Sequence, residues 1–353
     1  MNPSILARIE AGGDAYSFGR QIGEQVGAAF RERVLGQPEF AEAANLWKGS
    51  DYLSELSQRA HSAFPRYHRE LEGMAGGADV DLDDLLIWNL RGDLRFPPGM
   101  APAAAAALSE GCTTVMIPGD DDQPGIIAHN EDGAPELDGG CFWLSARPDD
   151  GLAFETFLYP GMLPGNAFAV TAAGLVQAIN NIRAHDLKPG IPRHFITRAV
   201  LDCHTLDEAV AVIGREDRAG GFHHNLGQAG DRRLLSVEAP ASGCAVRELT
   251  VPSAHANHLM DESLVDIPQA VTDSSATRQT RADELVAAGA ASAADAEAVL
   301  ADGKILRRPG DGMDDYGRTL ATGVFAIEAS RVKWTVHHKP DQSNVREGRV
   351  DVG

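Results

Sequence analysis

Apolar positions in the first hundred residues recur with the period of a helix. Over residues 14–35 they fall at every fourth position, as Phe18, Ile22, Val26 and Phe30, and Asp14 can cap the start. This spacing predicts an amphipathic helix. Similar patterns predict helix over 51–75 and 81–90. The first hundred residues are therefore expected to be mainly helical.

After Gly111 the pattern changes to short apolar segments that are separated by glycine- and proline-bearing turns. Such segments are typical of strands joined as hairpins. Strands are expected at 113–117, 125–129, 141–146, 152–159, 167–171, 175–180, 223–228, 232–238, 244–250, 320–329 and 332–338. Helices are expected to begin at Ile191 and after Thr205, where Glu208 completes a capping box, and to occupy 274–301.

Helices and strands thus follow one another in groups, which favours the α+β class over alternating βαβ units. Two sheets packed between helical layers would account for this order. Residues 97–107 interrupt it with three prolines and a run of alanines. That stretch is either a plain linker or an exposed loop that leads to a processing point, and composition does not separate the two.

The balance of charge limits the partners. The 353 residues include 51 acidic and 31 basic side chains, a formal net charge of −20. Such a chain repels phosphate backbones, so we expect no nucleic-acid partner. No signal sequence and no apolar run long enough to span a bilayer is evident, which predicts a cytoplasmic protein with no membrane partner. The four cysteines form no CxxC pair and are expected to be free thiols.

Cys112 differs from the other cysteines because it lies at an element boundary. By residue type and position alone, it is equally well a small core residue at the start of a strand. Gly111 before it favours a nucleophile, because glycine tolerates strained conformations and close approach by a neighbour. The thiol can then attack the Gly111 carbonyl carbon, and hydrolysis of the resulting ester would free Cys112 as a new N-terminus.

A terminal cysteine would contain both its nucleophile and its base. The thiolate is the reactive form, and a free cysteine has a pKa of about 8.5. An α-amino group titrates at about 7.7–8.0, so it can accept the thiol proton directly or through a water. No separate histidine is then needed.

Several segments together resemble the isopenicillin N acyltransferase family of N-terminal nucleophile hydrolases. Residues 111–114 (GCTT) followed by 129–133 (HNEDG) carry the first part of the resemblance. The remaining segments, in family order along the chain, are 16–23 (YSFGRQIG), 172–175 (AAGL) with Asn180, 190–194 (GIPRH) and 255–258 (HANH).

The resemblance implies a four-layer αββα sandwich formed by a single domain, residues 1–353. It also implies self-cleavage between Gly111 and Cys112. The products would be a mainly helical segment, 1–111, and a catalytic segment, 112–353, which stay associated. The implied chemistry is cleavage or transfer of an acyl group on a non-peptide amide. We expect no cofactor and no metal.

The same resemblance assigns roles to four further residues. Asp132 would orient the new α-amino group, although an Asp before Gly is otherwise a turn residue. Asn257 would line the oxyanion hole, and Thr114 would place its hydroxyl near the nucleophile during processing. Arg318 is the nearest match to an arginine that pairs with the acidic residue, one position out of register. His258 is interpreted as structural, and the pairs 223–224 and 337–338 as rim or surface histidines.

Three functions are weighed. The preferred one is hydrolysis of a small acylated molecule through a Cys112 thioester, because net acidity disfavours anionic acyl donors such as acyl-coenzyme A. The first alternative is transfer of the acyl group to an amine such as a β-lactam nucleus. The second is a non-catalytic protein of the same fold that binds a small amide. A metal-dependent amidohydrolase is also weighed; it would need a convergent set of histidines and aspartates, and the sequence has no HExxH motif. GxSxG and P-loop motifs are absent as well. It leaves the oligomeric state open, with a homo-oligomer among the alternatives.

Overall fold

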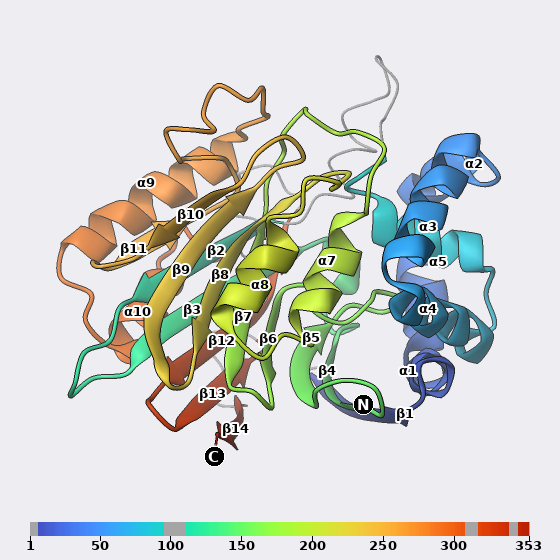
Figure 1. Cartoon of the computed structure of the whole chain (residues 1–353). Coiled ribbons are helices and arrows are strands. Elements are labelled where there is room, and N and C mark those ends of the chain that lie inside the picture. The colour runs from blue at the N-terminus through green and yellow to red at the C-terminus, as the bar shows by residue number, and fades with distance from the viewer. Residues whose placement is uncertain (1–5, 95–110, 308–316, 339–344, 353) are drawn as a thin grey trace.

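The computed structural model describes residues 6–94, 111–307, 317–338 and 345–352 (Figure 1). Residues 97–107, for which the sequence left two interpretations, lie outside this set. In the described part of the chain, no helix combines the length and the apolar character needed to cross a membrane.

The N-terminal part is helical, as predicted, but begins with a strand. Its elements are β1 (Ala7–Gly13), α1 (Ala15–Phe30) with a π-helical turn (Arg31–Leu35), α2 (Pro38–Trp47), α3 (Asp51–Ala63), α4 (Pro65–Ala78) and α5 (Leu82–Leu90). Asp14 caps α1 by accepting a hydrogen bond from the backbone of Ser17. The prediction of one continuous helix over 51–75 was wrong, because this stretch forms two helices. Pro65 lacks an N–H and excludes Phe64 from the helical conformation, so the chain breaks between α3 and α4.

Helices α1 and α4 pack at backbone distance because glycines line their contact. A Cβ atom at Gly73 would lie 2.1 Å from the carbonyl oxygen of Tyr16. One at Gly23 would lie 2.2 Å from the carbonyl oxygen of Met74. No side chain fits in either place, so glycine is required there.

Two sheets form the remainder of the fold. The first has the strand order β1-β4-β5-β6-β7-β8-β9-β10 and the second β11-β2-β3-β12-β13-β14. The further strands of the first sheet are β4 (Phe142–Pro148), β5 (Phe154–Leu158), β6 (Phe168–Thr171), β7 (Leu175–Asn181), β8 (Phe222–Gln228), β9 (Asp231–Ala239) and β10 (Ala245–Glu248). Those of the second are β2 (Gly111–Ile117), β3 (Gly125–Gly133), β11 (Ser253–His255), β12 (Arg318–Ile327), β13 (Arg331–His337) and β14 (Val345–Asp351).

The sheets face each other and are covered by helices on both outer sides (Figure 1). Helices α7 (Arg193–Val200) and α8 (Leu206–Ile213) lie on the first sheet, and α8 contacts β8 and β9. Helices α9 (Asp273–Ala287) and α10 (Ala293–Leu300) pack on the second sheet, against β2, β3 and β11. Strand β2 contacts β7 across the space between the sheets. These four layers confirm the predicted α+β class and its αββα arrangement.

Strand β1 was not predicted, and it makes the first sheet mixed, not purely antiparallel. It pairs in parallel with β4, with Ile9 opposite Leu144. Residues 1–111 are also joined to the rest through the Glu70–Arg198 ion pair, in which Arg198 Nη2 lies 2.8 Å from Glu70 Oε1 and both side chains are buried. The two halves that the sequence predicts therefore share one sheet and one core.

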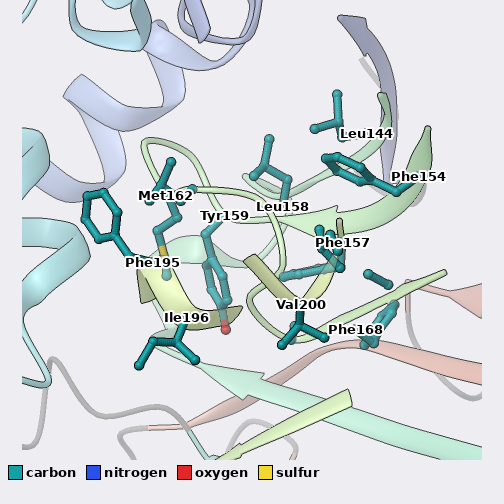
Figure 2. Close-up of a cluster of buried hydrophobic side chains, with 14 of the residues drawn as sticks. Leu144, Phe154, Phe157, Leu158, Tyr159, Met162, Phe168, Phe195, Ile196 and Val200 are labelled. Carbon is teal, nitrogen blue, oxygen red and sulfur yellow. The ribbon is translucent and has the colours of Figure 1, made fainter. Parts of the chain in front are cut away.

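An apolar cluster fills the interior beside the strands β4 to β6 and the helix α7 (Figure 2). Tyr159 lies within it, between Met162 and Val200 in this view, with its hydroxyl group at the end turned away from Met162. A buried tyrosine hydroxyl needs a hydrogen-bond partner. That partner leads directly to Cys112.

Candidate active site

Cys112 is the second residue of β2, between β3 and β11 in the second sheet. In the register, Cys112 is opposite Glu131, and Thr114 is opposite His129. Because side chains alternate along a strand, Cys112 and Thr114 face the first sheet, whereas Thr113 faces α9. The Cys112 side chain is buried, with 2% of its surface exposed. The predicted nucleophile therefore points into the space between the two sheets.

The thiol contacts a buried carboxyl group. Cys112 Sγ donates a hydrogen bond of 3.3 Å to Glu131 Oε2. The other carboxyl oxygen, Oε1, accepts one of 2.6 Å from the Tyr159 hydroxyl. Glu131 is 1% exposed, and burial raises its pKa to about 8. Burial thus favours the protonated form of the carboxyl group next to the thiol.

His129 fixes the position of the Glu131 proton. Asn180 Nδ2 donates to the His255 carbonyl, so its Oδ1 accepts the Thr114 hydroxyl proton at 2.8 Å. Thr114 Oγ1 must then accept from His129 Nδ1, 2.8 Å away, which leaves Nε2 without a proton. Nε2 lies 3.0 Å from Glu131 Oε2. Burial lowers the His129 pKa to about 3, so the imidazole is neutral and the shared proton belongs to the carboxyl group.

The backbone of Cys112 is held from the other side. Its N–H donates to Asn257 Oδ1 at 2.9 Å. Arg278, a buried residue of α9, donates to the Cys112 carbonyl oxygen, to Thr113 Oγ1 at 2.8 Å and to Asn257 Oδ1 at 2.7 Å. Asn257 Nδ2 donates to the Asn181 carbonyl at 2.9 Å. An amide nitrogen has two hydrogens, so one remains for an oxyanion.

Asp132 lies beside Asn257 and Arg278, on the opposite face of β3 from Glu131. Its Oδ1 accepts a hydrogen bond of 2.6 Å from the Thr319 hydroxyl. Burial raises the pKa of Asp132, and the positive charge of Arg278 acts against that rise. Gly111 is opposite Asp132 in the register, which places this carboxyl group next to the peptide bond predicted to be cleaved.

Arg318, expected to pair with the acidic residue, does not reach it. Its backbone pairs with Gly133 at the start of β12, and within the described ranges no hydrogen bond or ion pair joins its side chain to Asp132. Arg278 supplies the positive charge instead. A shift of one register position explains why Arg318 does not reach Asp132, because consecutive residues of a strand point to opposite faces.

The uncleaved thiol is a poor nucleophile. Burial, followed by the carboxyl groups of Glu131 and Asp132, raises the pKa of Cys112 well above its ordinary value. The backbone N–H of Asn181 acts in the opposite direction. Since the thiolate is the attacking form, this environment keeps Cys112 protonated until a base removes its proton.

Cys112, His129 and Glu131 place a sulfur, a nitrogen and a carboxyl oxygen within 4.8 Å of one another. Glu131 Oε2 links the other two, because it accepts from the thiol and lies 3.0 Å from His129 Nε2.

The histidine pairs are more deeply placed than expected. His223 and His224 are buried in β8, not at a rim. His223 Nε2 forms a hydrogen bond of 2.8 Å with Ser236 Oγ. The His223 ring also stacks on that of His255, with ring centroids 3.4 Å apart. His338 is buried as well, whereas His337 is partly exposed. Both faces of β8 are covered, so His223 and His224 are buried although they point in opposite directions.

Three comparisons place this site in context. Residues 118–341, more than half of the chain, match the family described as acyl-coenzyme A:6-aminopenicillanic acid acyl-transferase. The chain belongs to this family. The match confirms the resemblance drawn from the motifs, and it includes Asp132, Asn257 and Arg278, although it begins after Cys112.

Two curated relatives of this acyl-transferase family member have different activities. The β-alanyl-dopamine/carcinine hydrolase of Drosophila melanogaster is 29% identical over 217 residues, which are 57% of this chain and 55% of that protein. The acyl-coenzyme A:6-aminopenicillanic-acid-acyltransferase 40 kDa form of Emericella nidulans is 25% identical over 222 residues, 59% of this chain and 56% of that protein. The chain thus spans about half the length of these relatives.

Among solved structures, a mutant of the conjugated bile acid hydrolase from Clostridium perfringens is similar to this acyl-transferase family member. The TM-score is 0.46 at 10% sequence identity, over 67% of this chain and 92% of that one.

Proposed function

We propose that the protein is a self-cleaving cysteine hydrolase that cuts a non-peptide amide bond of a small acylated molecule. One observation supports it most directly: Cys112 presents both groups that the reaction needs. Its thiol lies 3.3 Å from Glu131, and its backbone nitrogen, the future α-amino group, lies 2.9 Å from Asn257. The segments 1–111 and 112–353 would stay associated through β1 and the Glu70–Arg198 pair.

In turnover, the α-amino group of Cys112 would take the thiol proton, and Sγ would attack the substrate carbonyl carbon. The spare hydrogen of Asn257 Nδ2 would stabilise the oxyanion, and Asp132 would orient the ammonium form of the terminus. Thr114 would hold the imidazole that faces Glu131. The amine leaves with a proton, and water then hydrolyses the thioester to a carboxylate and a free thiol.

Hydrolysis is preferred to transfer for two reasons. A curated relative is a β-alanyl-dopamine/carcinine hydrolase, and a net charge of −20 disfavours anionic acyl donors. Transfer to an amine acceptor is the second candidate, favoured by the Emericella relative. Free thiols at all four cysteines fit a reducing compartment, so we place the protein in the cytoplasm.

The test begins with a denaturing gel and N-terminal sequencing of the purified chain. We expect two fragments, of which the larger starts at Cys112, and one intact band for Cys112→Ala. The cleaved protein is then incubated with N-β-alanyl amines and N-acyl amino acids, and the released amine is measured by mass spectrometry, with and without a second amine as acceptor. Cys244→Ala, which alters an exposed thiol, is the control. An active protein that stays intact, or a Cys112→Ala variant with full turnover, would refute the proposal.

A further inference from the structure

Self-cleavage poses a problem of timing for the proposed function. The α-amino group that would activate Cys112 in the mature protein does not exist before cleavage. In the uncleaved chain that nitrogen belongs to the Gly111–Cys112 peptide bond and donates to Asn257 Oδ1. An amide nitrogen cannot accept the thiol proton. The first reaction of this protein therefore needs a different base from every later one.

The buried surroundings of the thiol contain one group that can serve. We infer that Glu131 is the catalytic base of self-cleavage, taking the proton of Cys112 Sγ through its Oε2 atom. This inference depends on the proposed function and names a residue for its first step. The Glu131 carboxyl is in hydrogen-bond contact with the thiol at 3.3 Å. Among the described residues it is the carboxyl group that both touches Sγ and shares its face of the sheet.

The nearby alternatives are less well placed. Asp132 lies on the other face of β3, where Thr319 donates to it. His129 Nε2 meets Glu131 Oε2, so it reaches the thiol only through that carboxyl group. Arg278 is a cation and has no proton acceptor. Cys112, Glu131 and His129 thus form a row in which the carboxyl group is in the middle.

The step balances without any co-reactant besides water. Ionised Glu131 takes the Sγ proton while Sγ bonds to the carbonyl carbon of Gly111. The tetrahedral intermediate collapses by breaking the C–N bond, and Glu131 gives the proton it took from Sγ to the departing nitrogen of Cys112. Water then hydrolyses the thioester and gives the Gly111 carboxylate, the free thiol and the new α-amino group. Glu131 is regenerated.

The surroundings of Glu131 prepare it for this role. The charged or titratable groups around it are Cys112 on β2, His129 on β3, Tyr159 after β5 and Arg91 after α5, with Asp132 on the other face of β3. Burial outweighs the others and sets its pKa at about 8. A base that titrates near the working pH is best matched to proton transfer. Cleavage should accelerate as pH rises through this value, because only the carboxylate can accept the proton.

The experiment follows cleavage of the full chain by pulse–chase labelling in cell-free translation. We expect Glu131→Gln to slow cleavage about 100-fold or more, since a general base contributes about 10²–10⁴-fold. Glu131→Asp should retain part of the rate. Glu238→Gln is the matched control, because Glu238 is another buried, histidine-paired glutamate, on β9, and we expect it to be cleaved like the wild type.

A second variant keeps the inference testable if Glu131→Gln does not fold. Tyr159→Phe removes a hydrogen bond that lowers the Glu131 pKa, so the pH midpoint of cleavage should move upward. A merely structural role would change the rate without moving the midpoint. Cleavage of folded Glu131→Gln at the wild-type rate, or an unmoved midpoint in Tyr159→Phe, would overturn the inference alone. A wild-type chain that is never cleaved would overturn the proposed function.

Discussion

The amide oxygen of Asn257 lies 2.9 Å from the backbone nitrogen of Cys112 and 2.7 Å from the guanidinium of Arg278. One side chain therefore links the start of β2 to α9. Its nitrogen donates to Asn181 on β7, in the opposite sheet. Asn257 thereby connects three layers of the fold at the point where cleavage is proposed.

Replacement of Asn257 should remove its donor to the oxyanion. Asn257→Leu removes both the acceptor and the donor, whereas Asn257→Asp keeps an acceptor for the terminus and loses the N–H groups. We expect both to lower kcat about 100–1000-fold with little change in KM, because loss of an oxyanion donor costs this much. Steady-state kinetics on the cleaved protein would measure it. Full activity of Asn257→Asp would show that the nitrogen donates nothing in the transition state.

Gly111→Ala should affect cleavage more than folding. An added Cβ would lie 3.5 Å from an Arg278 nitrogen and 3.6 Å from Asp132 Cβ, which are ordinary contacts. We expect the free energy of unfolding to change by less than about 1 kcal/mol. Cleavage should slow about tenfold or more, since a Cβ hinders the close approach to the Gly111 carbonyl carbon that glycine allows. Chemical denaturation and pulse–chase measure the two effects, and equal rates of cleavage would contradict the role of Gly111.

The helix contact in the N-terminal part predicts a large effect of a small substitution. A Cβ at position 73 would lie 2.1 Å from the Tyr16 carbonyl oxygen, so Gly73→Ala must push α1 and α4 apart. We expect a loss of about 2–3 kcal/mol in the free energy of unfolding. Gly303→Ala is the matched control, because a Cβ there meets nothing within 4 Å. Similar denaturation midpoints for the two variants would refute the close packing.

Glu70→Ala should destabilise the fold strongly. It leaves the guanidinium of Arg198, 0% exposed, with one fewer partner in the interior. Removal of one partner from a buried ion pair costs about 3–5 kcal/mol. Glu55→Ala breaks an exposed pair with Arg59 and should cost about 0.5 kcal/mol or less. A small effect of Glu70→Ala on urea unfolding would show that Asp202 alone suffices for Arg198.

The pH dependence of stability should report Glu131. Its pKa is raised from 4.5 to about 8 on folding, so above pH 4.5 the unfolded chain releases a proton that the folded chain keeps. The contribution of Glu131 to the free energy of unfolding is complete below pH 4.5 and is lost as pH rises towards 8. His129 acts oppositely, but only up to pH 6.5, since its pKa falls from 6.5 to about 3.

The window from pH 6.5 to 8 therefore isolates the glutamate. We compare Glu131→Gln in an uncleavable Cys112→Ala background with Cys112→Ala alone. As pH rises across this window, the free energy of unfolding of the double variant should increase by about 1–2 kcal/mol relative to that of Cys112→Ala. Urea unfolding at each pH would measure the difference, and groups common to both proteins cancel in it. A constant difference would contradict a buried, protonated Glu131.

Much of the fold could be predicted because most of its strands are short apolar runs that turn residues delimit. The signal fails where it depends on distant partners. Strand β1 has two buried apolar residues, Ile9 and Ala11, and owes its conformation to pairing with β4. Strand β14 alternates exposed and half-buried residues at a sheet edge and gives an equally weak pattern.

The candidate site divides in the same way. The position of Cys112 at the start of a strand was predicted and found, and its role as nucleophile stays a prediction. Glu131 could have been found from alternation, because it lies one residue from Asp132 in the same motif and must face the opposite side. Arg278 gave no signal: it is 166 residues from Cys112 along the chain, and only the packing of α9 on β2 brings them together.

The parallel pairing of β1 with β4 has a consequence for the thermodynamics of the protein. Once the bond before Cys112 is cut, the edge strand of one sheet belongs to a separate polypeptide. Unfolding then releases two molecules from one, and the folded fraction obeys mass action. The melting temperature of the cleaved protein should rise with its concentration, whereas that of uncleaved Cys112→Ala should not. By a single hydrolysis the chain would become an obligate heterodimer encoded as one sequence.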